Sequence, residues 1–209
     1  MEKKTPPRIK KTGLPLNTLS IVFTCSLVSI FPEAHSVMLY DRDGIAEGEI
    51  WRLVSCNLVH FNHIHLLYNL LAFGIAGFII ERNRYPHFIS FCFILSLIIS
   101  LSIYILEPNM AFYGGLSGLT CGAIVYFCCW GLQEEAPWRT ICQLLLLLLA
   151  AKICIEFFSH SSILPYFEHK TIHIAPLGHL AGSIGAFFIY KIFEKIYKNT
   201  MIQPIKNID

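Results

Sequence analysis

Six long apolar segments constrain the fold of this chain more than any other feature. They cover about residues 16–37, 58–80, 88–106, 111–132, 141–158 and 174–193, and short polar connections separate them. A helix of roughly 20 mostly apolar residues is long enough to cross the hydrocarbon core of a bilayer. The pattern therefore predicts an all-α membrane protein built as a bundle of six transmembrane helices.

The composition agrees with a membrane bundle. Hydrophobic residues make up 55% of the 209 residues and charged residues only 14%, whereas soluble domains carry about 25% charged residues. The formal net charge of +2 excludes intrinsic disorder, which needs few apolar residues and a high net charge, and nothing supports nucleic-acid binding. The eight cysteines include no C-x-x-C pair, so we interpret them as packing residues rather than disulfide or metal ligands.

The distribution of Lys and Arg predicts the orientation, because cytoplasmic loops and tails retain these residues. With both termini inside, only Arg42, Arg52 and Lys170 lie outside. We expect a cytoplasmic tail at 1–13, one six-span domain at 14–195 and a cytoplasmic tail at 196–209. The basic, apolar N-terminus is similar to a signal peptide, but no small-residue cleavage site follows it, so a retained first span is favoured.

Three clusters of polar and small residues lie within the apolar segments. The second segment contains His60, His63, His65 and Asn69, the fourth opens with Gly114-Gly115-Leu116-Ser117-Gly118, and the sixth contains His179. Polar groups in hydrocarbon are costly and usually functional. His65, Ser117 and His179 each lie a few residues into a span that enters from outside, which predicts one layer roughly 8 to 10 Å below the outer boundary.

This layer contains the groups needed for acyl transfer. Ser117 and His179 form a nucleophile and its general base if they face each other across the bundle. The backbone N–H of Ser117, in the first turn of its helix, and the side chains of His65 and Asn69 are candidate donors to an oxyanion. The glycines around Ser117 leave it uncrowded and let helices approach closely.

The acidic residues are not expected to assist the base. No Asp or Glu in the fourth or sixth segment is placed to orient His179, so the sequence predicts a Ser-His dyad rather than a triad. Lys152 and Glu156, four residues apart in the fifth segment, share one helix face, and we interpret them as a structural ion pair. Replacing Glu156 or Glu81 is therefore not expected to abolish activity in a folded protein.

Other interpretations of the same residues stay open. Small residues in membrane helices often serve packing, and a lone histidine is often a hydrogen-bonded structural residue. The histidines of HFNHIH do not share a face and H-E-x-x-H is absent, so no metal or other cofactor is expected. A proton-relaying transporter would show inverted repeats or midplane carboxylates, and neither is found in the sequence.

The motifs resemble those of the rhomboid intramembrane serine proteases, from Trp51 to about Ile189. Trp51-Arg52 is similar to a W-R pair of the first outer loop in that family, and Glu81 lies where the family often has a Glu. His60, His65 and Asn69 have the family's H-x4-H-x3-N spacing. Residues Gly115 to Gly118 match its G-x-S-G motif, and His179 to Gly182 match its H-x-x-G motif.

The resemblance implies roles for these residues. It implies that Ser117 is the nucleophile and His179 the base, that His65 and Asn69 form the oxyanion hole with the Ser117 N–H, and that His60 is a supporting residue. The remaining matched positions, expected to support the site, are Gly115, Gly118, Trp51, Arg52 and Glu81. Two departures are Cys121, where some members have a Tyr under the catalytic His, and Ala186, where a Gly is common.

The resemblance also implies a substrate and a location. It implies cleavage of single-span membrane proteins within a lipid bilayer, in a multi-pass protein of a bacterial inner (plasma) membrane. The segments YDRDGIAEGEIWRLVSCNLVH and YGGLSGL are most similar to the rhombosortase branch, which implies cleavage of a C-terminal Gly-Gly-type anchor of exported proteins. The alternative is a catalytically inactive rhomboid-like protein that binds membrane helices.

Overall fold

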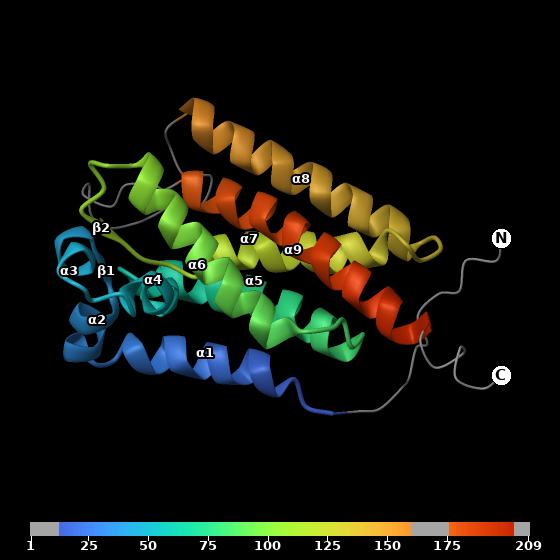
Figure 1. Cartoon of the computed structure of the whole chain (residues 1–209), viewed down its shortest axis with the longest axis horizontal. Coiled ribbons are helices and arrows are strands. Elements are labelled where there is room, and N and C mark those ends of the chain that lie inside the picture. The colour runs from blue at the N-terminus through green and yellow to red at the C-terminus, as the bar shows by residue number, and fades with distance from the viewer. Residues whose placement is uncertain (1–12, 160–175, 203–209) are drawn as a thin grey trace.

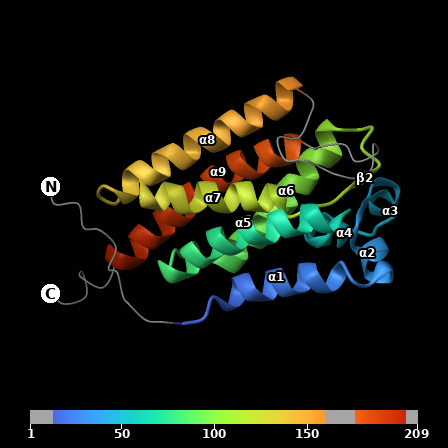
Figure 2. The same cartoon turned by 180° about the vertical axis from the view of Figure 1, so that it is seen from behind.

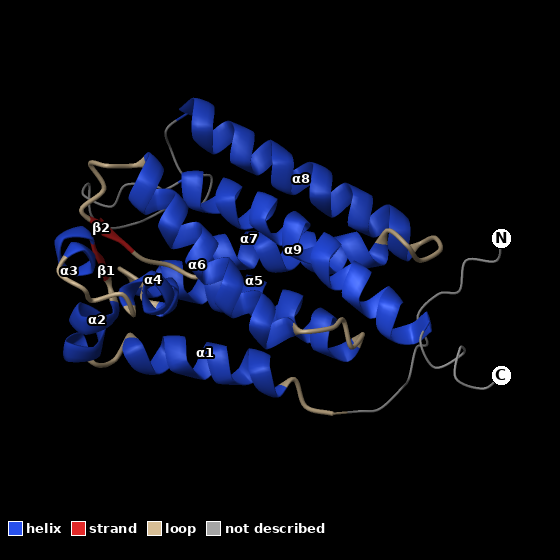
Figure 3. Ribbon diagram, in the orientation of Figure 1, coloured by secondary structure: helices blue, strands red, loops and turns tan. Residues whose placement is uncertain are grey.

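The computed structural model describes residues 13–159 and 176–202, and nearly all of them are helical apart from short connections (Figures 1 and 3). The predicted tails fall largely outside these residues, as do Lys170 and the first two residues of the sixth predicted segment. The described residues form a helical bundle with loops at one end of it.

The described elements follow one another in a simple order. The helices are α1 (Leu16–Val28), α2 (Pro32–Met38), α3 (Arg42–Ala46), α4 (Arg52–Ser55), α5 (His63–Arg82), α6 (Phe88–Leu106), α7 (Ser117–Gly131), α8 (Trp138–Ser159) and α9 (Pro176–Ile202). A 3-10 turn, η1 (Cys56–Leu58), follows α4, and two short strands, β1 (Tyr40–Asp41) and β2 (Phe112–Tyr113), pair antiparallel.

The first predicted span is wrong as a single helix. The chain bends by 112° between α1 and α2. The reason is Pro32, the first residue of α2, because a residue before proline is held away from the helical region, and Phe31 is indeed extended. Residues 29–38 therefore turn away from the direction of α1 instead of continuing it.

Two other predicted spans begin too early, whereas the third is confirmed as a helix over 88–106. The second helix begins at His63, because the Asn62 side chain accepts a hydrogen bond from the backbone N–H of His65 and caps α5 there. The fourth begins at Ser117, because Gly115 has a φ of +138° that no helix allows. His60 therefore lies in the connection before α5 and not inside a span.

Among the described residues, three helices are long and apolar enough to cross a membrane: α5, α6 and α8. A fourth span is counted only if α1 and α2 are taken together, and α7 is apolar but has 15 residues. Large apolar side chains of these helices point outward, among them Leu67, Leu71, Ile75, Leu144, Leu147 and Leu148. Apolar surface of this extent is consistent with an integral membrane protein.

Helix α7 is the centre of the bundle. Nearly all of its residues from Gly118 to Gly131 are buried, and α5, α6, α8 and α9 pack around it (Figures 1 and 2). Seven of the eight cysteines are buried, as expected for packing residues, whereas Cys154 is exposed. The helix that begins with Ser117 is thus shielded on all sides by other helices.

Helices α7 and α9 cross with their backbones close together. Small residues spaced four apart face each other at the crossing: Gly118 and Gly122 on α7, and Gly178, Gly182 and Ala186 on α9. A methyl group on Gly118 would lie 2.9 Å from the carbonyl oxygen of Gly178, and one on Gly182 would overlap the carbonyl oxygen of Gly118. Such small-residue contacts let membrane helices approach until their backbones touch.

We expect Gly182→Ala to destabilise the protein, because its methyl group meets backbone atoms of α7 that cannot move without separating the helices. Overpacking of this kind costs about 1 to 3 kcal/mol. The apparent melting temperature of the purified protein in detergent should fall clearly. Gly74→Ala in α5 is the control, since a methyl group there has no neighbour within 4 Å, and equal melting of both variants would contradict the assigned crossing.

Candidate active site

Ser117 and His179 are brought together by the crossing of α7 and α9. Ser117 is the first residue of α7, and His179 lies in the first turn of α9. Their neighbours Gly118 and Gly178 pack backbone to backbone, so the two side chains extend from adjoining helix starts. Both lie nearer the helix ends than predicted, at the end of the bundle that carries α2 to α4 (Figure 2).

His65 enters the same region from α5. A methyl group on Gly115 would lie 2.9 Å from Cε1 of His65 and 3.7 Å from Oγ of Ser117, so the imidazole and the hydroxyl both border this glycine. His65 is buried. The side chains of His65 and Ser117, from the second and fourth predicted segments, therefore lie at the same glycine, and His179 of the sixth follows Gly178, which packs against Gly118.

Asn69 lies one turn after His65 on the same face of α5. Its side chain is buried, and Nδ2 donates a hydrogen bond to the carbonyl oxygen of His65 at 3.0 Å. That bond uses one of the two amide hydrogens. The geometry thus holds the amide in place while keeping one donor for another acceptor.

His60 holds the loop that precedes Ser117. Its Nε2 accepts a hydrogen bond from the backbone N–H of Leu116 at 3.3 Å, and Gly115 N–H donates to the carbonyl of Cys56 at 3.1 Å. Its ring also lies edge to face against His65, with centroids 5.1 Å apart. An imidazole nitrogen that accepts carries no proton, so His60 is a neutral support for the G-x-S-G loop.

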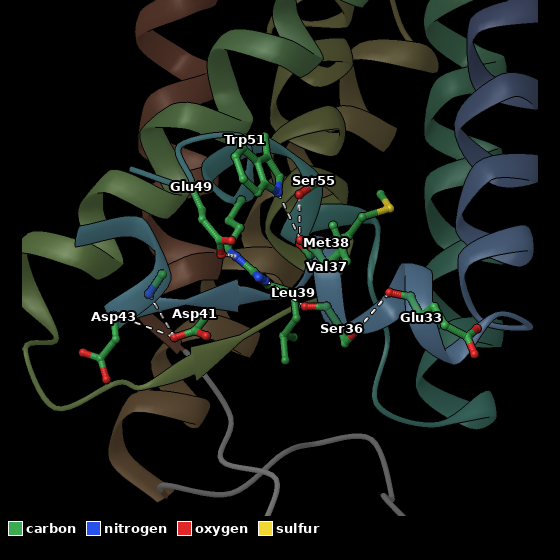
Figure 4. Close-up of polar contacts among 12 residues, drawn as sticks. Glu33, Ser36, Val37, Met38, Leu39, Asp41, Asp43, Glu49, Trp51 and Ser55 are labelled. Carbon is green, nitrogen blue, oxygen red and sulfur yellow. Dashed lines mark hydrogen bonds and ion pairs between the residues drawn. The ribbon is translucent and has the colours of Figure 1, made fainter. Parts of the chain in front are cut away.

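Trp51 and Arg52 act on the loops rather than at the hydroxyl of Ser117. Together with Ser55 they donate hydrogen bonds of 2.7 to 3.1 Å, and Figure 4 shows the Trp51 and Ser55 side chains turned toward their acceptors. The acceptors are the otherwise unpaired carbonyls at the end of α2, those of Ser36, Val37, Met38 and Leu39. Arg52 also pairs with Glu49 at 2.5 Å.

The strand pair connects these loops to the catalytic region. Tyr40 of β1 pairs with Tyr113 of β2, just before Gly115. The hydroxyl of Tyr113 would lie 2.8 Å from a methyl group on Gly178, beside His179. The loops between α1 and α5 therefore fix the start of α7 relative to the start of α9.

Glu81 lies at the far end of α5 and has a structural role. Its Oε1 accepts from the backbone and side-chain N–H groups of Asn17, and its Oε2 accepts from the backbone N–H and hydroxyl of Thr18, at 2.5 to 3.1 Å. These donors lie at the start of α1. A carboxylate satisfies and stabilises a helix N-terminus, so Glu81 fastens α1 to α5.

The expectation that no carboxylate lies beside His179 is wrong. Oε2 of Glu156 lies 2.7 Å from Nδ1 of His179, and Glu156 is only 2% exposed. Glu156 belongs to α8, in the fifth predicted segment, whereas the predicted dyad rested on the lack of a carboxylate in the fourth and sixth segments. The predicted ion pair is confirmed, because Nζ of Lys152 lies 2.7 and 2.8 Å from the two carboxylate oxygens.

The sequence did contain a signal for this contact. An ionisable pair in a segment otherwise rich in leucine is expensive in a membrane and marks a functional site by default. Cys121, one turn after Ser117 on α7, is buried and lies within the electrostatic field of Lys152 and Glu156. A small residue at this position is compatible with an acidic side chain reaching His179 from α8.

Comparison with known proteins gives a consistent result. Residues 47–195, which include every candidate residue named above, match the family described as Rhomboid domain. The chain is 27% identical over 165 residues to YdcA of Bacillus subtilis (strain 168), which is named among rhomboid proteases, covering 75% of this chain and 76% of that protein. It is 31% identical over 80 residues to rhomboid protease GlpG of Haemophilus influenzae, covering 38% of this chain and 41% of that protein.

We expect Gly115→Ala to abolish activity, because the position has a φ of +138° and the added methyl group would meet the His65 imidazole at 2.9 Å. The substitution displaces either Ser117 or His65. Cleavage of a membrane substrate by the purified variant measures the effect. Gly48→Ala is the control, since it has a φ of +107° but no neighbour within 4 Å, and full activity of Gly115→Ala would show that this contact is unimportant.

Proposed function

Because this chain belongs to the rhomboid family and is a rhomboid-type serine protease, we propose that it is an intramembrane endopeptidase with Ser117 as nucleophile and His179 as general base. The observation that carries the proposal is the crossing of α7 and α9 at Gly118 and Gly178, the neighbours of these two residues. The crossing supports a catalytic pair at adjoining helix starts.

The reaction follows from the chemistry of these groups. Oγ of Ser117 attacks the carbonyl carbon of the substrate while its proton passes to Nε2 of His179. The carbonyl electron pair moves to oxygen and then returns as the C–N bond breaks, and the leaving amine takes the proton from His179. Water then attacks the acyl-enzyme with His179 again as the base, which restores the Ser117 hydroxyl.

The oxyanion requires donors that are already in place when its charge develops. The backbone N–H of Ser117 has no partner within its own helix because it opens α7. The side chains of His65 and Asn69 supply the further donors in this proposal. Their burial and the bond from Asn69 to the His65 carbonyl support a rigid arrangement that costs no reorganisation during the reaction.

We propose six spans with both termini in the cytoplasm. In addition to α5, α6 and α8, this topology needs α1, α7 and α9 as crossing helices. The start of α1 and the end of α9 lie at the same end of the bundle, opposite to α2 and α3 (Figure 1), which supports termini on one side. The site then lies near the outer face of the inner membrane, where water reaches its polar residues.

The proposed substrates are single-span membrane proteins, cleaved within or near the outer edge of the bilayer. A transmembrane helix must unwind locally to expose its carbonyl group, and glycine near the scissile bond lowers that cost because it is a poor helix former. This supports the finer proposal of a C-terminal Gly-Gly-type anchor, as in the rhombosortase branch. Incubation of the purified protein with a panel of anchor segments, with and without Gly-Gly, followed by sequencing of the fragments tests the substrate class.

Ser117→Ala should abolish cleavage and leave folding intact, because it removes one hydroxyl group. Fragment formation and the melting temperature are measured together. Ser96→Ala in α6, which removes the hydroxyl of a buried serine outside the site, should keep activity. Cleavage by Ser117→Ala at the wild-type rate would refute the nucleophile, and a folded wild type that binds anchors without cutting them would favour the inactive binding protein.

Asn69→Ala should impair catalysis without abolishing it. Removing one oxyanion donor costs about 2.7 to 4 kcal/mol, or roughly 10² to 10³ in kcat, and the other donors remain. Asn83→Ala is the matched control, because Asn83 makes the same type of bond to the carbonyl four residues before it at the end of α5. A loss as complete as that of Ser117→Ala in a folded protein would assign a different role to Asn69.

A further inference from the structure

We propose that Glu156 is a positioning residue for His179, so that the catalytic group is extended across three helices by a carboxylate from α8. The inference rests on the proposed function of Ser117 and His179. It gives Glu156 a role that a Ser-His dyad does not include, and it assigns Lys152 the role of keeping the Glu156 carboxylate charged.

The geometry around Nδ1 of His179 sets the position of the ring proton. The distance of 2.7 Å from Nδ1 to Oε2 of Glu156 is that of a charge-assisted N–H to carboxylate bond. Nζ of Lys152 is farther from Nδ1, at 3.2 Å, and lies 2.7 and 2.8 Å from the carboxylate oxygens. Nδ1 therefore donates to Glu156, and Nε2 carries no proton and is the nitrogen that can accept one from Ser117.

The carboxylate also stabilises the product of that proton transfer. When Nε2 takes the Ser117 proton, the ring becomes an imidazolium whose Nδ1–H already points at Glu156. The attraction between the two charges is strong because little water surrounds them. Burial disfavours a charged ring, so the contact with Glu156 stabilises the positive charge that develops on His179 during the reaction.

Lys152 allows the Glu156 carboxylate to stay ionised in this buried position. An unpaired buried carboxylate takes up a proton instead of staying charged, and a neutral acid would no longer favour the required tautomer. The half-buried ammonium of Lys152 bonds to both oxygens, so the pair adds no net charge. Among the described residues, the other titratable side chains close enough to interact with these groups are His65 on α5 and Cys121 on α7.

A purely structural role is the competing explanation, in which the ion pair only ties α8 to α9. Apolar side chains of α8 such as Leu144 and Leu147 are exposed, whereas Glu156 is buried against His179. The two roles predict different outcomes when both charges are removed together. Replacing a whole buried ion pair by apolar residues of similar volume is often neutral or stabilising, so such a protein remains folded.

The test is the double variant Lys152→Met with Glu156→Leu. If Glu156 positions His179, kcat for an anchor substrate should fall on the order of 10²- to 10⁴-fold, while KM and the melting temperature stay near the wild-type values. If the pair is only a structural tie, kcat per folded enzyme should be unchanged. An unchanged kcat, or a loss explained entirely by unfolding or by a raised KM, would overturn the proposal.

The chain offers a matched control pair on α9. Glu194 and Lys198 are also four residues apart and 2.7 Å from each other, but they lie at the opposite end of that helix from His179. Glu194→Leu with Lys198→Met removes the same two charges by the same substitutions. This control should retain the wild-type kcat.

A spectroscopic measurement tests the tautomer without a substrate. In protein labelled with ¹⁵N-histidine, the His179 signals are identified by their loss in His179→Ala. The proposal expects a protonated Nδ1 and an unprotonated Nε2 in the wild type at neutral pH, and a changed tautomer ratio in the Lys152→Met, Glu156→Leu variant. A wild-type ring protonated on Nε2, or no change in the variant, would overturn the role of Glu156 even if no anchor segment is cleaved.

Discussion

The close approach of α7 and α9 is the contact on which the candidate site depends. Side chains larger than hydrogen at Gly118 or Gly182 would separate the two backbones, and Ser117 and His179 lie beside this contact. In a membrane, where burial of apolar surface does not drive helices together, packing of small residues is a main source of association. Glycine at these positions thus lets the two proposed catalytic residues, which are distant in the sequence, lie beside each other's helices.

The surrounding loops fix the positions of the residues beside this crossing. The carbonyl of Cys56 and the ring of His60 hold the backbone at Gly115 and Leu116, and β1 and β2 connect the same loop to the segments between α1 and α5. Such supports matter because a displacement of the reacting groups by about 1 Å can cost 10²-fold in rate. At the other end of the bundle, Glu81 fastens α1 to α5, far from the reacting groups.

The contact between Glu156 and His179 changes how the polar residues are grouped. The histidines, Ser117 and Asn69 alone describe a site built from α5, α7 and α9. With Lys152 and Glu156 included, α8 contributes as well, since the polar atoms of these two residues lie 3.2 and 2.7 Å from Nδ1 of His179. Burying charges in an apolar helix costs free energy, and a role of Lys152 and Glu156 at His179 accounts for that cost.

The sequence by itself determined the apolar helices and the burial of seven of the eight cysteines, because apolar length and side-chain type are local properties. It also determined that Lys152 and Glu156 pair, since residues four apart share a helix face. Only the tertiary structure decided that α1 and α2 bend apart, that His60 lies before α5, and that Glu156 reaches His179. The last contact joins two helices at a crossing, and the spacing of residues within either helix contains no information on which face its neighbour meets.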